Sequence, residues 1–168
     1  MEVHVARADI TNMPVDAIVN PTNSRGTMEN SVGTVIRKFG GDEIQTALMS
    51  KAPLAVGAAL VTEGRDLPAK WIIHTPVTAE PDEKLEVENI RRAARAALLA
   101  ADANKYSVVA IPGMYSGNDV PLAEAARAIV EEIRAHKRTF PETVYLVDDD
   151  PDMVEAFEDS LEHAQQPL

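Results

Sequence analysis

The chain of 168 residues contains no cysteine. Disulfide bonds, thiolate nucleophiles and cysteine-ligated metal sites are therefore excluded. Aromatic residues make up only 4% of the sequence, which gives little support for binding single-stranded nucleic acid by base stacking. No apolar run approaches the roughly 18 residues of a membrane-spanning helix, and no signal peptide is recognisable. We therefore expect a cytoplasmic protein that does not enter the membrane.

Positive charge is also scarce, because 16 Lys and Arg stand against 27 Asp and Glu, for a net charge of −11. The imbalance is concentrated at the end of the chain, where residues 141–168 carry no Lys or Arg. Their acidic residues are Glu142, Asp148, Asp149, Asp150, Asp152, Glu155, Glu158, Asp159 and Glu162. Such a field opposes binding to nucleic acid, which depends on cations that neutralise phosphates. The simplest interpretation is a solvated face that promotes solubility.

The length and an apolar content of 45% fit one globular domain over residues 1–168. Six short runs have the pattern of strands: Val3–Arg7, Ala17–Asn20, Ala58–Thr62, Trp71–His74, Val108–Ile111 and Thr143–Val147. Five segments between them have helical signals: Ser31–Phe39, Asp42–Ser50, Glu86–Asn104, Pro121–His136 and an acidic helix at Pro151–His163. Strands that alternate with helices predict a largely parallel sheet covered by helices on both faces.

The most informative motif lies near the start of the chain. It reads Ala8-Asp9-Ile10-Thr11, then the apolar run Ala17-Ile18-Val19, then Asn20-Pro21-Thr22-Asn23. Asparagine carries a donor and an acceptor without charge, which suits it to hydroxyls and amides of a polar ligand. The motif closely resembles the start of the macro domain, a module that binds ADP-ribose and in some members hydrolyses its derivatives. The resemblance implies a three-layer α/β/α fold with a mixed, largely parallel six-stranded sheet.

The resemblance also implies roles for four residues of this motif. Asp9 takes the place of an acidic side chain that accepts a hydrogen bond from the adenine amino group. The backbone amide of Ile10 takes the place of one that contacts the ring. Asn20 and Asn23 match two ligand-binding asparagines, and the second asparagine also positions a water in the hydrolytic class that the chain resembles most. Asn23 is therefore a candidate catalytic residue.

The second loop, Asn20–Gly33, departs from the family pattern. A glycine run normally leads into a helix here, so that backbone amides and the helix N-terminus contact a phosphate. In this chain the run is replaced by Met28-Glu29-Asn30-Ser31, and Glu29 adds negative charge. Ser31 is predicted to cap the helix, and Ser31 and Val32 remain candidate ligand contacts. The catalytic aspartate of the hydrolytic class corresponds to Gly33, which offers no hydrogen-bonding side chain.

The third loop, Ile111–Pro121, lies between a strand and a helix and corresponds to a second phosphate loop. Tyr115, Ser116, Gly117 and Asn118 are its candidate ligand contacts, and Ser116-Gly117 matches the family. Ser116-Gly117-Asn118-Asp119 resembles the loop of terminal ADP-ribose glycohydrolase, whose aspartate acts with a lysine. Asp119 is therefore a second catalytic candidate, although the lysine position holds Thr75 or Pro76. A helix N-cap is the simpler role for Asp119.

Histidine gives no sign of a metal site. His4, His136 and His163 are isolated from other ligands at metal spacing, so we predict neither a metal nor a cofactor. His74 ends a predicted strand and is expected to be structural.

Three functions remain open. The first is binding of a small ADP-ribose-like ligand or a related adenine nucleotide. The second is hydrolysis of ADP-ribosyl derivatives or of ADP-ribose 1''-phosphate. The third is a catalytically inert macro fold that serves a structural or partner-binding role. The adenine and ribose positions favour the first, and the altered phosphate loops weigh against the second.

Overall fold

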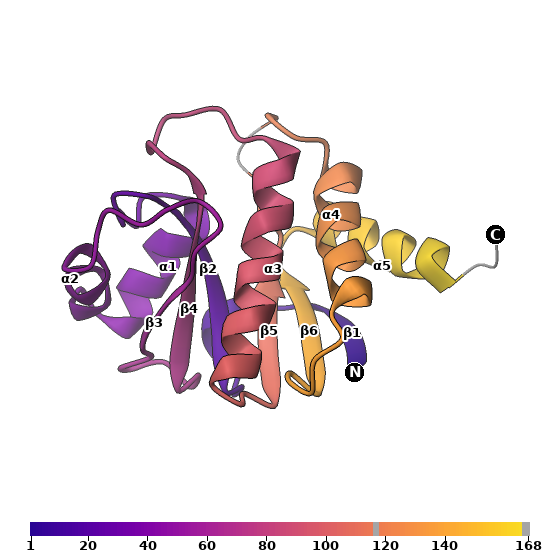
Figure 1. Ribbon diagram of the computed structural model, residues 1–168, viewed down its shortest axis with the longest axis horizontal. Helices are drawn as coiled ribbons and strands as arrows, with labels where there is room; N and C mark the ends of the chain where they lie inside the picture. The colour runs from indigo at the N-terminus through magenta and orange to yellow at the C-terminus, as the bar shows by residue number, and fades with distance from the viewer. Residues whose placement is uncertain (116–117, 166–168) are drawn as a thin grey trace.

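A computed structural model of the chain describes residues 1–115 and 118–165. Its centre is a mixed six-stranded sheet in the order β1-β6-β5-β2-β4-β3 (Figure 1). All neighbouring strands are parallel except β3, which is antiparallel to β4. The strands are β1 (Glu2–Arg7), β2 (Ala17–Asn23), β3 (Leu60–Glu63), β4 (Trp71–Thr78), β5 (Val108–Pro112) and β6 (Thr143–Asp148).

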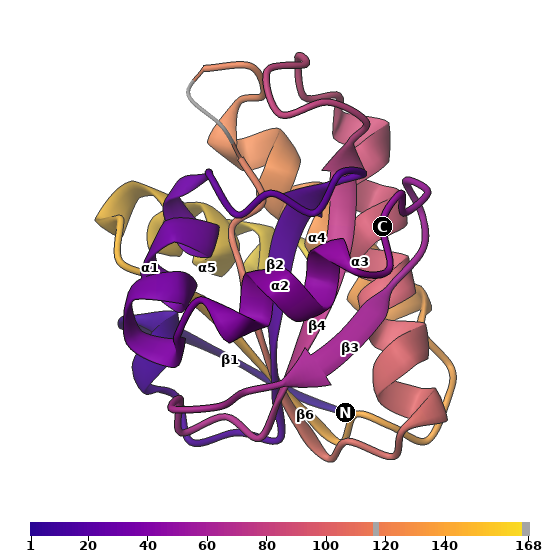
Figure 2. The same cartoon turned by 90° about the vertical axis from the view of Figure 1, so that its left-hand side faces the viewer.

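Helices cover both faces of this sheet. In the described part of the chain they are the 3-10 helix η1 (Ile10–Asn12) and the α-helices α1 (Ser31–Gly40), α2 (Glu43–Met49), α3 (Val87–Ala103), α4 (Leu122–Ala135) and α5 (Pro151–Gln165). Figure 2 shows α1 and α2 together on one side of the sheet, with α3 and α4 beyond it. None of the described helices combines the length and the apolar character needed to cross a membrane.

Strand alternation divides the core into two layers. Successive side chains of a strand point to opposite faces, and β2 is buried along its whole length. Ala17 and Val19 therefore join the core beneath α3, α4 and α5, whereas Ile18 joins the core beneath η1, α1 and α2. The predicted three-layer α/β/α architecture with a mixed, largely parallel six-stranded sheet is confirmed.

Two details of the helix starts differ from the predictions. The side chain that caps α1 is Asn30 rather than Ser31, because the Asn30 side chain accepts a hydrogen bond from the Gly33 amide. Pro121, the predicted first helical residue, stands at the N-cap of α4, so the helix begins one residue later, at Leu122. Pro151 does begin α5 as predicted. Strands β2 and β4 also run beyond their predicted ends at Asn20 and His74.

Candidate functional site

Two adjoining cavities lie at the edge of the sheet where the parallel strands β1, β2, β5 and β6 end. In an α/β sheet this edge is the usual place for a ligand. We call the first the base cavity. Its volume is about 310 Å³, and it is bounded by the loops after β1, β5 and β6 and by α1. We call the second the loop cavity. Its volume is about 300 Å³, and it is bounded by the loops after β2, β4 and β5. The first turn of α1 and the start of the third loop line both, through Ser31, Val32, Gly113 and Tyr115.

Asp9 lies in the wall of the base cavity and also shapes the turn after β1. Its Oδ1 accepts hydrogen bonds from the Thr11 amide at 2.9 Å and from the Thr11 hydroxyl at 2.7 Å. It thereby caps η1, whose first residue is Ile10. Because these bonds engage only Oδ1, the second carboxylate oxygen is left for another donor.

The remaining walls of the base cavity are largely apolar. Ile10, Val35, Val147 and Phe39 line it together with the half-buried ring of Tyr115. Phe39 is 51% exposed, one of the most exposed large hydrophobic side chains in the described chain. An exposed aromatic ring at a cavity edge offers a flat surface for a heterocycle. Sequence reasoning missed both Val35 and Phe39, because helical periodicity does not tell which residues face a cleft.

Tyr115 separates the two cavities. Its hydroxyl donates to Asp148 Oδ1 at 3.2 Å and lies 3.4 Å from Asp150 Oδ2. Burial raises the pKa of the Tyr115 phenol, and the nearby carboxylates of Asp148 and Asp150 raise it further, so the hydroxyl stays protonated. Tyr115 was predicted as a candidate ligand contact, but the sequence did not reveal the acidic partners that hold its hydroxyl.

Asp148 anchors this arrangement from the end of β6. It is buried and also accepts hydrogen bonds from the amides of Gly113, at 3.2 Å, and Asp150, at 3.0 Å. Burial raises the pKa of the Asp148 carboxyl, against the hydrogen bonds that lower it. A Cβ on Gly113 would lie 2.9 Å from Asp148 Oδ2 and 2.8 Å from the Tyr115 ring. Glycine at 113 therefore lets the third loop close over Asp148.

Asn23 lines the loop cavity, but its side chain is occupied by its own loop. Its Nδ2 donates to the Thr27 carbonyl at 3.1 Å and to the Thr27 hydroxyl at 2.9 Å. Its Oδ1 accepts from the Arg25 amide at 3.0 Å and from the Thr27 amide at 3.4 Å. Both ends of the amide are thus used to shape residues 23–27.

The place of the family's glycine run is filled by two side chains. Met28 is buried, and its amide donates to the Gln45 side chain at 2.8 Å. Asn30 donates to the Pro21 carbonyl and caps α1 through the Gly33 amide at 2.6 Å. Because Asn30 takes the Gly33 amide, an anion at this helix terminus is left with the amides of Ser31 and Val32.

The charge of the cleft is negative. Its described lining residues include the acidic side chains Asp9, Glu29, Glu83, Asp148 and Asp149, and they include neither Lys nor Arg. Coulomb repulsion from these carboxylates opposes a diphosphate in the cleft.

A sequence model of the macro domain matches residues 19–129. The chain belongs to the macro domain family. An uncharacterised protein of Aquifex aeolicus is 46% identical to it, over 96% of this chain and 98% of that protein. Similar solved structures include a variant Oceanobacillus iheyensis macrodomain with ADPR, with a TM-score of 0.83 and 23% identity over 95% of this chain and 91% of that one. A Trypanosoma brucei macrodomain in complex with ADP-ribose has a TM-score of 0.82 and 21% identity, over 95% and 69% of the two chains.

Asn20, one of the predicted ligand contacts of this macro domain, lies in the sheet interior rather than in either cavity. It is fully buried, and its Nδ2 lies 3.0 Å from Nδ1 of His74 on the neighbouring strand β4. The other ring nitrogen of His74 lies 2.7 Å from the Thr62 hydroxyl. Burial lowers the pKa of His74 to about 3, so its ring is neutral at physiological pH. Asn20 and His74 therefore form a buried polar link between strands.

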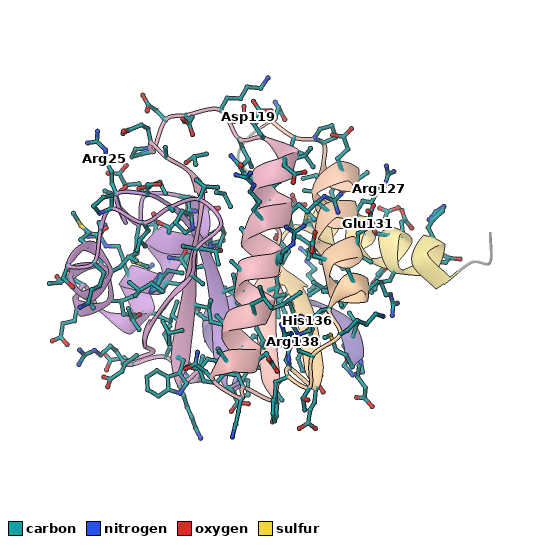
Figure 3. The ribbon with its side chains drawn as sticks, in the orientation of Figure 1. Arg25, Asp119, Arg127, Glu131, His136 and Arg138 are labelled. Carbon is teal, nitrogen blue, oxygen red and sulfur yellow. The ribbon has the colours of Figure 1, made fainter. Side chains whose placement is uncertain are left out.

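Asp119, the second catalytic candidate, also lies outside both cavities. Its exposed carboxylate accepts a hydrogen bond from the Leu85 amide at 3.0 Å, which joins the loops that precede α3 and α4. Figure 3 shows Asp119 above the start of α3. It does not cap α4, whose N-cap is Pro121. Asn118 is exposed and lines neither cavity, and the candidate contacts Ser116 and Gly117 lie outside the described residues.

Proposed function

We propose that this macro domain binds ADP-ribose or a related adenine nucleotide, and that the adenosine half supplies most of the affinity. The observation that carries the proposal is the base cavity, where one Asp9 oxygen remains available beside apolar walls and an exposed aromatic ring. The similar O. iheyensis and T. brucei macrodomains, solved with ADPR and with ADP-ribose, support the same ligand class.

The chemistry of the base cavity is complementary to adenine. Adenine presents an amino donor next to a ring nitrogen acceptor. Asp9 offers the matching carboxylate acceptor, and Ile10, as the first residue of η1, has an amide without an intrahelical partner. Val35, Phe39 and Tyr115 supply apolar and aromatic surface for the ring faces. One edge and both faces of the base would therefore be recognised.

In this proposal, the diphosphate contributes less to the affinity than it would in a macro domain with a glycine-rich second loop. Met28 and Asn30 fill the place of the glycines, and the Gly33 amide is already bonded. Glu29 and Glu83 place two carboxylates in the loop cavity, where phosphates would pass. Each of these features weakens an anion site.

Hydrolysis of ADP-ribosyl derivatives is the weaker alternative. Asn23 uses both ends of its amide within its loop, and Gly33 provides no general base. Asp119 is bonded to the Leu85 amide outside the cleft. None of these three positions therefore offers a free polar side chain in the cleft that could activate water. A catalytically inert fold with a structural role is the third possibility.

Calorimetric titration with adenosine, AMP and ADP-ribose tests the proposal. We expect all three to bind, with ADP-ribose gaining less than about tenfold over adenosine, since one or two weakened phosphate contacts contribute about 1 kcal/mol. A gain of about a thousandfold would show that the phosphate loops function despite their sequence. Absence of binding by all three at millimolar ligand would leave the inert fold as the correct account. Release of ADP-ribose from an ADP-ribosylated acidic protein would support the hydrolase instead.

A further inference from the structure

A third and larger cavity lies away from the cleft, in the groove between α4 and α5. Its volume is about 620 Å³, about twice that of either cavity of the cleft. We call it the α4–α5 groove. Its apolar lining is formed by Ala123, Val130 and Ala156. Figure 3 shows Arg127 and Glu131 on the side of α4 that adjoins α5.

The α5 wall of this groove carries three carboxylates, together with Ser160 and His163. Asp152, Glu155 and Asp159 line it at intervals of three and four residues, which places them along one face of the helix. Across the groove, Glu131 is paired with Arg91 of α3 at 3.3 Å. By contrast, no ion pair within 4.0 Å joins the three α5 carboxylates to a cation in the parts of the chain that are described, and none involves Arg127.

Negative charge is concentrated in the segment of the chain that contains α5. Residues 141–168 hold nine of the 27 acidic residues and none of the 16 basic ones, so the rest of the chain is nearly balanced. Three of these nine, Asp152, Glu155 and Asp159, line the groove. Like charges spaced three and four residues apart also destabilise a helix, and a cationic partner would relieve that repulsion.

We propose that the α4–α5 groove is a docking site for a Lys- or Arg-rich segment of a partner protein that carries an aliphatic anchor. The anchor fits over Ala123, Val130 and Ala156, and the cations pair with Asp152, Glu155 and Asp159. The groove shares no lining residue with the cleft, so both sites can be occupied together. The proposal is therefore independent of adenine binding.

The test uses a fluorescent peptide of lysine with leucine at every fourth position, followed by anisotropy with the full chain. A variant with Asp152→Asn, Glu155→Gln and Asp159→Asn neutralises the groove. A control with Asp66→Asn, Asp82→Asn and Glu86→Gln removes the same charge from exposed sites elsewhere. The groove variant should lose about tenfold in affinity, because three exposed pairs contribute roughly 0.5 kcal/mol each, and the control should lose less than about twofold.

A second variant tests shape without changing charge. Ala123→Trp fills the exposed end of the groove and should also weaken the peptide by about tenfold, through loss of the apolar contact. Thermal melting of each variant verifies that it folds. Equal losses in the two charge variants, or full binding by Ala123→Trp, would show that the attraction is unspecific and overturn the proposal. Failure of the peptide to bind the unmodified chain at physiological salt would overturn it as well.

Discussion

Gly33→Ala tests how tightly the second loop is built around the Asn30 cap. A Cβ at position 33 would lie 2.7 Å from Asn30 Oδ1 and 3.0 Å from Met28 Cα, which are both closer than ordinary contact. Displacing the Asn30 cap costs about 1 kcal/mol. Crowding against the Met28 backbone costs about 1–3 kcal/mol more. The better helix propensity of alanine returns at most about 1 kcal/mol, so we expect a net loss of about 1–3 kcal/mol in the free energy of unfolding.

Urea unfolding of four proteins measures this effect: the unmodified chain, Gly33→Ala, Asn30→Ala and the double variant. Because Asn30→Ala removes the atom nearest the new Cβ, Gly33→Ala should cost about 1 kcal/mol less in that background. Additive effects, or stabilisation by Gly33→Ala alone, would refute the reasoning. Gly33→Asp would meet the same obstacle, so restoring the aspartate of the hydrolytic class requires rebuilding the cap as well.

Three further predictions concern the core and the cleft. The buried ring of His74 stays neutral down to pH about 3, whereas the same ring in the unfolded chain is protonated near pH 6.5. The free energy of unfolding therefore decreases as the pH drops below 6.5, and His74 should account for about 2 kcal/mol of the decrease between pH 7 and pH 5. In urea unfolding, His74→Gln should show a shallower pH dependence. Phe39→Ala should lower the affinity for adenosine about tenfold in calorimetry, because stacking is lost, while the melting temperature hardly changes. Phe39→Tyr should bind adenosine with unchanged affinity. Equal affinities of the unmodified chain and both variants would show that Phe39 is not part of the site. Tyr115→Phe should lower the free energy of unfolding by about 1–2 kcal/mol, because Asp148 loses a hydrogen-bond donor. The affinity for adenosine should change by less than about threefold. A large loss of affinity would mean that the hydroxyl contacts the ligand.

The fold could be predicted from the sequence because its signals are local and agree with one another. Apolar runs of strand length alternate with helical stripes, and Pro151 marks the start of α5 where it was expected. The cap of α1 was placed one residue late, because Asn30 and Ser31 are both good N-caps and the residue types alone do not choose between them.

The site was less accessible to sequence reasoning, because its geometry depends on contacts between distant segments. The alternation of β2 puts Asn20 on the same face as Ile18, but the partner that holds it, His74, is 54 residues away. Asp119 likewise bonds to Leu85, 34 residues earlier. Phe39 gave no signal, because a phenylalanine on an amphipathic helix normally points into the core. The capping bonds of Asp9 are local, so its place in the turn after β1 could be read from the sequence.

The central claim is that Asp9 and Ile10 read the adenine edge, and comparison of adenosine with inosine tests it most directly. Inosine replaces the amino donor by a carbonyl that would face the Asp9 carboxylate. We expect the unmodified chain to favour adenosine by about a hundredfold, since a buried polar mismatch costs about 3 kcal/mol. Asp9→Asn keeps an oxygen for Thr11 and should bring the two affinities within about fivefold, whereas Glu83→Gln, as a control, should not. Equal binding of adenosine and inosine by the unmodified chain would contradict the account.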